Sequence, residues 1–313
     1  MKKSCLLVSV LLFLIVLSGC TAKEDSGVPP LTSFAYEEGY IVDTFEASHT
    51  GIDQPRGILS IGDLLYVCDW KTNSIIVLDN GQNPIDQIGS IGSAPLEFIR
   101  PTGITADESH IYVIDSGNNR VQVLTYQKEF IKSIPLPAFP EVAFWDIAVG
   151  GDKTIYVASN AIIPNEAHIY MQRGDSAFKA LDVGFSGKLY AADGKVFALE
   201  TYELETLKDG YRIKSGKNNL YQIERDSVIK IAAWPMEYTA GDFLVDNNNI
   251  VCLSTAYLTL DVFRNNGDYQ ATLVGEQKYL QTFAFDVSMA VNDEGSYFVT
   301  NFQGGEIVKI WKK

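Results

Sequence analysis

The sequence predicts an all-β protein built as a closed ring of six four-stranded sheets. Three observations carry this prediction. Short β-branched or aromatic runs recur at intervals of 41 to 54 residues, turn residues separate the runs, and the chain ends one strand short of its sixth repeat. Repeats of about 40 to 50 residues with four strands each are typical of the blades of a β-propeller.

The first two repeats align without a gap at a shift of 46 residues. Residues 54–58 lie over residues 100–104, and residues 66–69 lie over residues 112–115. Weaker copies of the middle strand follow, so that six residues mark equivalent positions: Tyr66, Tyr112, Tyr156, Phe197, Val251 and Phe298. The runs are rich in strand-forming residues, and the Gly, Asn and Asp between them favour hairpin turns. We therefore expect six β-blades rather than helices.

The two ends of the chain complete each other. The last repeat runs from Glu306 to Trp311 and stops after its third strand, whereas Gly39–Phe45 is a strand-like segment ahead of the first repeat. Placing this segment on the outside of the sixth blade closes the ring and covers two open sheet edges, which would otherwise favour aggregation. Residues 33–313 are thus predicted to form one closed domain.

The pattern Pro-x-Gly-Ile, followed by the residues from Ile111 to Leu124, resembles the NHL repeat. The whole chain resembles six-bladed propeller lipoproteins related to NHL-repeat proteins. In the fourth repeat, an insertion from Glu200 to Asn218 replaces a tight turn. The resemblance implies a fold rather than a function, because NHL-like rings include protein- and RNA-binding platforms, lyases and scaffolds.

The first residues are typical of a secretory signal. Lys2 and Lys3 precede an apolar run that ends at Leu17, which is too short for the roughly 20 residues needed to span a membrane. The sequence Leu-Ser-Gly-Cys that ends at Cys20 resembles the bacterial lipobox, which implies removal of residues 1–19 and lipidation of Cys20. An ordinary secretion signal with an incidental cysteine is the alternative.

Residues 20–32 are predicted to form the lipidated cysteine and a flexible spacer, since they contain Gly27, Pro29 and Pro30 and show no periodicity. Lys23-Glu24-Asp25 resembles the export signal of surface lipoproteins in Bacteroidetes, although solvated spacer charge is an equal alternative. These features predict a bacterial cell-envelope protein that is attached to a membrane by its lipid. The outer membrane is the favoured location, with exposure at the cell surface if the export signal acts.

Composition excludes several classes of function. The chain has 25 Lys and Arg against 39 Asp and Glu, a net charge of −14, which argues against nucleic-acid binding. Three histidines and four cysteines are too few for a metal site rich in these residues. Cys68 and Cys252 lie in apolar strands of separate blades, so we expect buried free thiols rather than a disulfide. Asp69 and Asp115 end equivalent strands, where an Asp side chain typically caps a turn.

Acidic residues near the start of the innermost strands suggest a metal site. The repeats place Arg56, Thr102, Trp145, Gly241 and Ser288 at one level around the channel, and Gly57, Gly103, Asp146, Asp242 and Met289 at the next. Asp146, Asp242 and Asp286 could converge there and bind Ca²⁺ through carboxylate oxygens. Calcium-dependent lactonases and gluconolactonases share this architecture, and the likeness here is one of residue type. Charge pairing across the channel, with Arg56 and Arg100 nearby, is the competing interpretation.

The end of the channel where the innermost strands begin could instead bind a ligand. Arg56, Arg100 and Trp145 combine bidentate donors with a flat apolar surface, which suits a carbohydrate, a peptide or a carboxylate. Packing between blades is the alternative role for the aromatic residues.

The sequence therefore favours a lipid-anchored propeller that binds a protein, peptide or glycan partner through one face of its ring. An enzyme is the less favoured alternative, either a calcium-dependent hydrolase similar to lactonases and gluconolactonases or a metal-dependent lyase at the central channel. A structural subunit of an envelope assembly is a third interpretation. No Gly-x-Ser-x-Gly elbow or phosphate-binding glycine loop is present.

Overall fold

The computed structural model describes residues 35–313, except 46, 81, 139–142, 160–168, 182, 184, 208–209, 216–217, 236–237, 247–248, 276–286 and 303. The predicted signal peptide, Cys20, the spacer and Asp286 lie outside the described residues. Within the described residues, no helix is long and apolar enough to cross a membrane.

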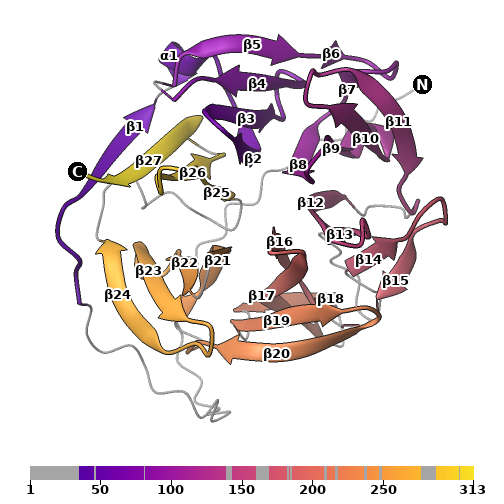
Figure 1. The fold of residues 1–313 in the computed structure, drawn as a ribbon. Coiled ribbons are helices and arrows are strands. Elements are labelled where there is room, and N and C mark those ends of the chain that lie inside the picture. The colour runs from indigo at the N-terminus through magenta and orange to yellow at the C-terminus, as the bar shows by residue number, and fades with distance from the viewer. Residues whose placement is uncertain are drawn as a thin grey trace, which may run out of the picture.

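Six sheets are arranged radially around a central axis, in the order in which they occur along the chain (Figure 1). Blade 1 contains β2 (Pro55–Ile61), β3 (Leu64–Asp69), β4 (Ser74–Leu78) and β5 (Pro84–Ile88). Blade 2 contains β8 (Pro101–Ala106), β9 (His110–Asp115), β10 (Arg120–Thr125) and β11 (Phe130–Pro135). Blade 3 contains β12 (Phe144–Val149), β13 (Ile155–Ser159), β14 (Ile169–Gln172) and β15 (Lys179–Leu181). In each blade the strands run from the axis outward.

The other three blades follow the same plan. Blade 4 contains β16 (Ser186–Ala192), β17 (Lys195–Leu207), β19 (Asn219–Glu224) and β20 (Ser227–Ala233). Blade 5 contains β21 (Ala240–Asp246), β22 (Asn249–Ser254), β23 (Thr259–Arg264) and β24 (Tyr269–Val274). Blade 6 contains β25 (Met289–Val291), β26 (Tyr297–Asn301), β27 (Glu306–Lys312) and β1 (Tyr40–Phe45). The all-β, six-bladed prediction is confirmed.

Short elements join or extend the blades. The insertion predicted in blade 4 is a hairpin, in which β17 continues past the sheet and pairs with β18 (Gly210–Ser215). The strands β6 (Ser90–Ile91) and β7 (Glu97–Phe98) form a small parallel pair between blades 1 and 2. A single helical turn, α1 (Ala47–Thr50), and a short 3₁₀ turn, η1 (Ser116–Asn118), complete the described elements.

The N-terminal strand closes the ring as predicted. β1 pairs antiparallel with β27 along its whole length, from Tyr40 opposite Lys312 to Phe45 opposite Ile307. Ahead of it, Tyr36 forms a parallel bridge with Thr272 of β24. The start of the described chain therefore contacts the outer strand of blade 5 before it completes blade 6.

The apolar core lies between the blades. Six clusters of buried side chains each join two neighbouring blades, and together they continue around the ring. Cys68 and Cys252 are buried in two different clusters as free thiols, as expected from the sequence. Burial raises the pKa of both thiols, so neither is a reactive thiolate.

Candidate functional site

The antiparallel blades give the ring two distinct faces. The innermost strands begin at one face, called here the start face, which also carries the loops between second and third strands. The turns between first and second strands lie at the opposite face, called here the hairpin face. In blade 1, for example, Pro55 at the beginning of β2 pairs with Asp69 at the end of β3, and Ile61 pairs with Leu64 across the turn.

Asp69 and Asp115 have the turn-capping role predicted for them. The buried Asp69 carboxylate accepts four backbone N–H bonds at 2.8–3.3 Å from the segments on either side of it. Asp115 accepts the backbone N–H of Ile99 at 2.8 Å and the Nε–H of Arg120 at 2.7 Å. Both carboxylates hold loops of the start face in place and are themselves fully occupied.

Two of the three predicted ligand-binding residues come together at the start face. The Arg56 Cζ atom lies 4.2 Å from the ring centroid of Phe302 and 5.7 Å from that of Trp70. The Arg100 Cζ atom lies 4.9 Å from the Trp70 centroid. The two rings meet edge to face at 6.0 Å. These four residues, from blades 6, 1 and 2, form what we call the Arg-aromatic cluster, in which guanidinium groups and rings attract each other.

Arg100 is held at the edge of this cluster. Its φ is +53°, and its backbone N–H donates to Asn73 Oδ1 at 2.9 Å. Its guanidinium is exposed, and within the described part of the chain it makes no ion pair or hydrogen bond. The structure thus presents one positive group at the start face that lacks a carboxylate partner in the described residues.

Trp145, the third predicted residue, does not join the cluster. Its side chain is half-buried, and its carbonyl oxygen lies 2.9 Å from where a Cβ on Gly103 would be. Trp70 occupies the place among the arginines that the sequence had suggested for Trp145. A signal for Trp70 was available, because it directly follows the turn-capping Asp69 and so had to lie in a loop of the start face.

The strand registers define one level of the channel wall and correct the sequence alignment. In each blade, one residue of the innermost strand pairs with the equivalent position of the second strand, for example Ile147 with Val157 and Met289 with Val299. The residues that directly precede these paired residues form one level of the channel wall. The level consists of Gly57, Gly103, Asp146, Lys188, Asp242 and Ser288. Met289 was therefore placed one residue out of register. Lys188 of blade 4, which the sequence alignment left out, lies between the two acidic positions.

Glycine and aspartate serve different packing needs at this level. A Cβ on Gly57 would lie 2.4 Å from the carbonyl oxygen of Thr102, so neighbouring innermost strands approach too closely there for any side chain. Elsewhere a carboxylate bridges the gap. Asp146 Oδ2 accepts the N–H of Leu189 at 2.8 Å, and Asp242 Oδ2 accepts the N–H of Met289 at 2.7 Å. Each aspartate thus connects its own blade to the next one.

The two aspartates and Lys188 form a charged wall on one side of the channel. Asp146 Oδ1 accepts the N–H group of Ile147 at 3.0 Å, and Asp242 Oδ1 accepts the N–H group of Phe243 at 2.8 Å. Burial raises the pKa of Asp146, and burial together with the charge of Asp146 raises the pKa of Asp242 to about 7; the charge of Lys188 opposes both shifts. Lys188 Nζ also lies 3.3 Å from Ser288 Oγ. An acid whose pKa lies near 7 inside a channel marks a candidate functional group.

The described residues of this wall do not by themselves complete a calcium site. Among the described residues, no group of three or more His, Cys, Asp or Glu side chains could hold a metal ion. Asp146 and Asp242 supply at most four carboxylate oxygens, each of which also accepts one backbone N–H bond. Ca²⁺ requires six to eight oxygen ligands. Because Asp286 lies outside the described residues, the metal role of Asp146, Asp242 and Asp286 stays a prediction.

Comparison with known proteins agrees with this architecture. A family described as 6-bladed beta-propeller, DUF5128, matches residues 47–234, which is more than half of the chain. The chain belongs to this family. The matched segment starts at the helical turn ahead of blade 1 and ends directly after the last strand of blade 4.

Solved structures of other propellers resemble this member of the family in fold. A streptogramin B lyase is 14% identical, with 88% of this chain and 98% of that chain covered and a TM-score of 0.58. A putative exported protein from Bacteroides fragilis is 11% identical, with 91% and 98% covered and a TM-score of 0.58. Virginiamycin B lyase from Staphylococcus aureus is 12% identical, with 87% and 99% covered and a TM-score of 0.54. At these identities the likeness is one of fold alone.

Proposed function

We propose that this protein is a lipid-anchored propeller of the bacterial cell envelope that binds an anionic ligand at its start face. The Arg100 guanidinium carries this proposal, because it is exposed beside Trp70 and has no ion-pair partner among the described residues. The partner would be a protein, a peptide or a glycan that carries a carboxylate, sulfate or phosphate group.

The Arg-aromatic cluster has the chemistry that such a ligand requires. A guanidinium can donate two parallel hydrogen bonds to a planar anion, which a lysine cannot. Trp70 lies against that guanidinium and is only partly buried, so it can also contact the apolar part of the ligand. Arginine and tryptophan are the residues most often responsible for affinity at interfaces. The positive site also stands out on a chain whose net charge is −14.

The binding test uses purified protein and immobilised arrays of acidic and neutral oligosaccharides and peptides. We expect retention of acidic probes only. Arg100→Ala should weaken retention about tenfold or more, as is usual for the loss of a charged hydrogen-bonding partner at an interface. Trp70→Ala should weaken it as well.

Arg225→Ala is the matched control, because it removes the same charge from an exposed turn between β19 and β20, at the hairpin face. It should leave retention unchanged. Equal losses in Arg225→Ala and Arg100→Ala would show that only overall charge matters. Retention that survives Arg100→Ala and Trp70→Ala would exclude the cluster as the binding site.

The anchor is tested by Cys20→Ser in the native host. Because diacylglycerol on one cysteine supplies two chains, the unaltered protein should be in the membrane fraction and should incorporate radiolabelled palmitate. Cys20→Ser should lose the label and leave the membrane fraction. A variant that keeps its label would contradict lipidation at Cys20.

A further inference from the structure

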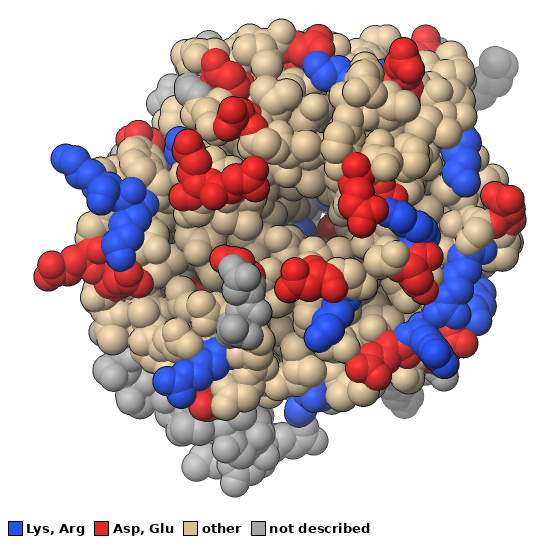
Figure 2. All heavy atoms as spheres, in the orientation of Figure 1, with Lys and Arg blue, Asp and Glu red and all other residues tan. Residues whose placement is uncertain are grey.

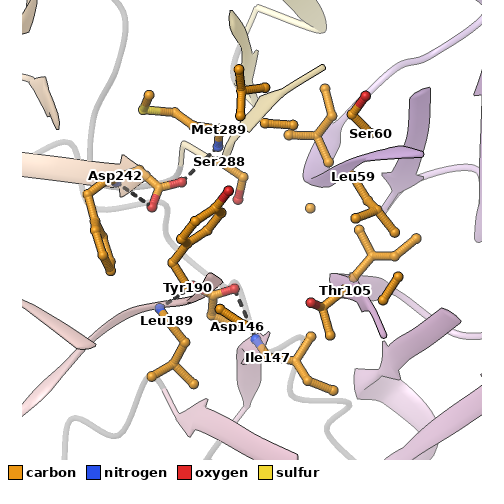
Figure 3. A pocket seen from close by; sticks show the side chains of 18 residues that line it. Leu59, Ser60, Thr105, Asp146, Ile147, Leu189, Tyr190, Asp242, Ser288 and Met289 are labelled. Carbon is orange, nitrogen blue, oxygen red and sulfur yellow. Dashed lines mark hydrogen bonds between the residues drawn. The ribbon is translucent and has the colours of Figure 1, made fainter. Parts of the chain in front are cut away.

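The half of the channel towards the hairpin face is a cavity of about 150 Å³ (Figure 3). It starts at the level of Asp146 and Asp242 and continues past Leu59, Thr105 and Tyr190. This volume corresponds to about five water molecules at the density of the liquid. A small aliphatic molecule with a similar number of heavy atoms would fit. The Arg-aromatic cluster contributes no residue to the lining.

The cavity presents hydrogen-bonding groups that the fold does not use. The hydroxyls of Ser60, Thr105 and Tyr190 line it, and none of them has a hydrogen-bond partner within the described residues. The Tyr190 ring packs edge to face on Phe243 at 6.1 Å, and Figure 3 shows it along the Asp242 side of the channel with its hydroxyl directed towards Ser288. Burial and nearby carboxylates raise its pKa to about 12, so the phenol stays neutral. These hydroxyls can accept hydrogen bonds from a ligand.

The hairpin face surrounds the mouth of this cavity with negative charge. At least one acidic residue lies in the turn between first and second strands, or at the strand end beside it, in every blade: Asp63, Asp107, Glu108, Asp152, Asp193, Asp246, Asp293 and Glu294. Figure 2 shows acidic side chains gathered around the central opening, with few basic ones close to it. Lys153 offsets part of this charge, since its Nζ lies 2.6 Å from Glu108 and 3.4 Å from Asp107. A cleft rimmed by one sign of charge concentrates ions of the opposite sign.

We propose that this cavity is a second binding site, for a small organic cation whose ammonium group enters from the hairpin face and lies against Asp146 and Asp242. Its N–H groups would donate to the carboxylates and to the unused hydroxyls. Its methylene groups would contact the apolar lining, which includes Leu59, Ile104 and Ile147.

The hydrogen-bond acceptors of the cavity favour an ammonium over other ligands. An ammonium needs about three acceptors, which the carboxylates and hydroxyls supply, whereas a calcium ion needs at least six. A neutral ligand would gain nothing from the acidic rim. Lys188 offsets one of the two carboxylate charges, so the wall keeps a net negative charge only while both aspartates are ionised.

This charge balance makes binding depend on pH. The titratable groups near Asp242 are Asp146, Lys188, Tyr190 and the neutral thiol of Cys252 on β22. β8 and β25 bring no titratable side chain, and Arg56 of β2 stacks on Phe302 outside the cavity. Because the pKa of Asp242 is raised to about 7, its carboxyl group is mostly neutral at pH 5.5 and ionised at pH 8.5, so the wall is more negative at the higher pH. Cation binding should therefore strengthen as the pH rises and should release a proton near neutrality.

Calorimetric titration with butylammonium tests the proposal, with butan-1-ol as a neutral probe of nearly the same size. We expect butylammonium to bind at pH 8.5, about tenfold more weakly at pH 5.5, and butan-1-ol not to bind. Asp146→Asn and Asp242→Asn should each weaken binding about tenfold, the usual effect of losing a hydrogen bond to a charged group. Lys188→Met removes the competing ammonium and should strengthen butylammonium binding. This variant tests the proposal even if the aspartate variants do not fold.

Arg100→Ala is the control, because it alters the start face and should leave butylammonium binding unchanged. A negative result with butylammonium therefore does not contradict the proposed start-face site, and a negative result with acidic probes does not contradict the cavity site. Equal binding of butan-1-ol, weaker binding in Lys188→Met, or Ca²⁺ binding that butylammonium cannot displace would each overturn the assignment.

Discussion

A chain that begins at residue 46, and so lacks β1, is expected to melt roughly 10 °C or more below a chain that begins at residue 33. β1 contributes the outer strand of blade 6, with six residues paired to β27. Its Tyr40 and Val42 also pack on the cluster between blades 5 and 6. Removing it exposes the edge of β27, where a second molecule can pair. Scanning calorimetry and light scattering measure both effects.

A synthetic peptide spanning residues 39–45 provides the complementary experiment. When added in excess to the shortened chain, it should restore part of the lost melting temperature, because binding to the native state alone raises apparent stability. A peptide with Val42→Asp should not restore it, since Val42 packs on the core cluster. A shortened chain that melts like the longer one would show that β1 does not hold the ring closed.

Raising the pH from 5.5 to 8.5 is expected to cost the protein about 2 kcal/mol of unfolding free energy through Asp242 alone. The pKa of Asp242 is about 7 in the folded protein and higher than in the unfolded chain, because burial and the Asp146 charge disfavour its carboxylate. The folded state therefore binds the proton more tightly. This contribution is fully present below the unfolded pKa and is lost as the pH rises through the folded pKa.

Urea unfolding of the unaltered protein and of Asp242→Asn at the two pH values measures this contribution. The asparagine cannot titrate, so its unfolding free energy should vary less with pH by about 2 kcal/mol, whatever its absolute stability. Groups far from the channel wall titrate equally in both proteins and cancel in the comparison, so the difference reports Asp242 and its interaction with Asp146. A pH dependence that is the same in both would show that Asp242 does not hold its proton in this range.

The repeat pattern was sufficient to predict the ring and its closure, and it came close to the channel wall without resolving it. Five of the six innermost strands shift register near their beginning, which moves the alignment of one blade against another by a residue. The described pairing of β25 has no such shift. Counting along the sequence therefore misplaced Met289, and the alignment left out Lys188 of blade 4.

The sequence by itself determined the number of blades, their strand order and the strand that closes the ring. These properties depend on local strand and turn preferences, which recur along the chain at intervals of 41 to 54 residues. Only the tertiary structure decided which side chains meet. The stacking of Arg56 and Arg100 with Trp70, and the electrostatic interaction of Lys188 with Asp146 and Asp242, join residues of different blades. Their contacts depend on how closely neighbouring blades approach, and that distance is set by packing across the whole ring.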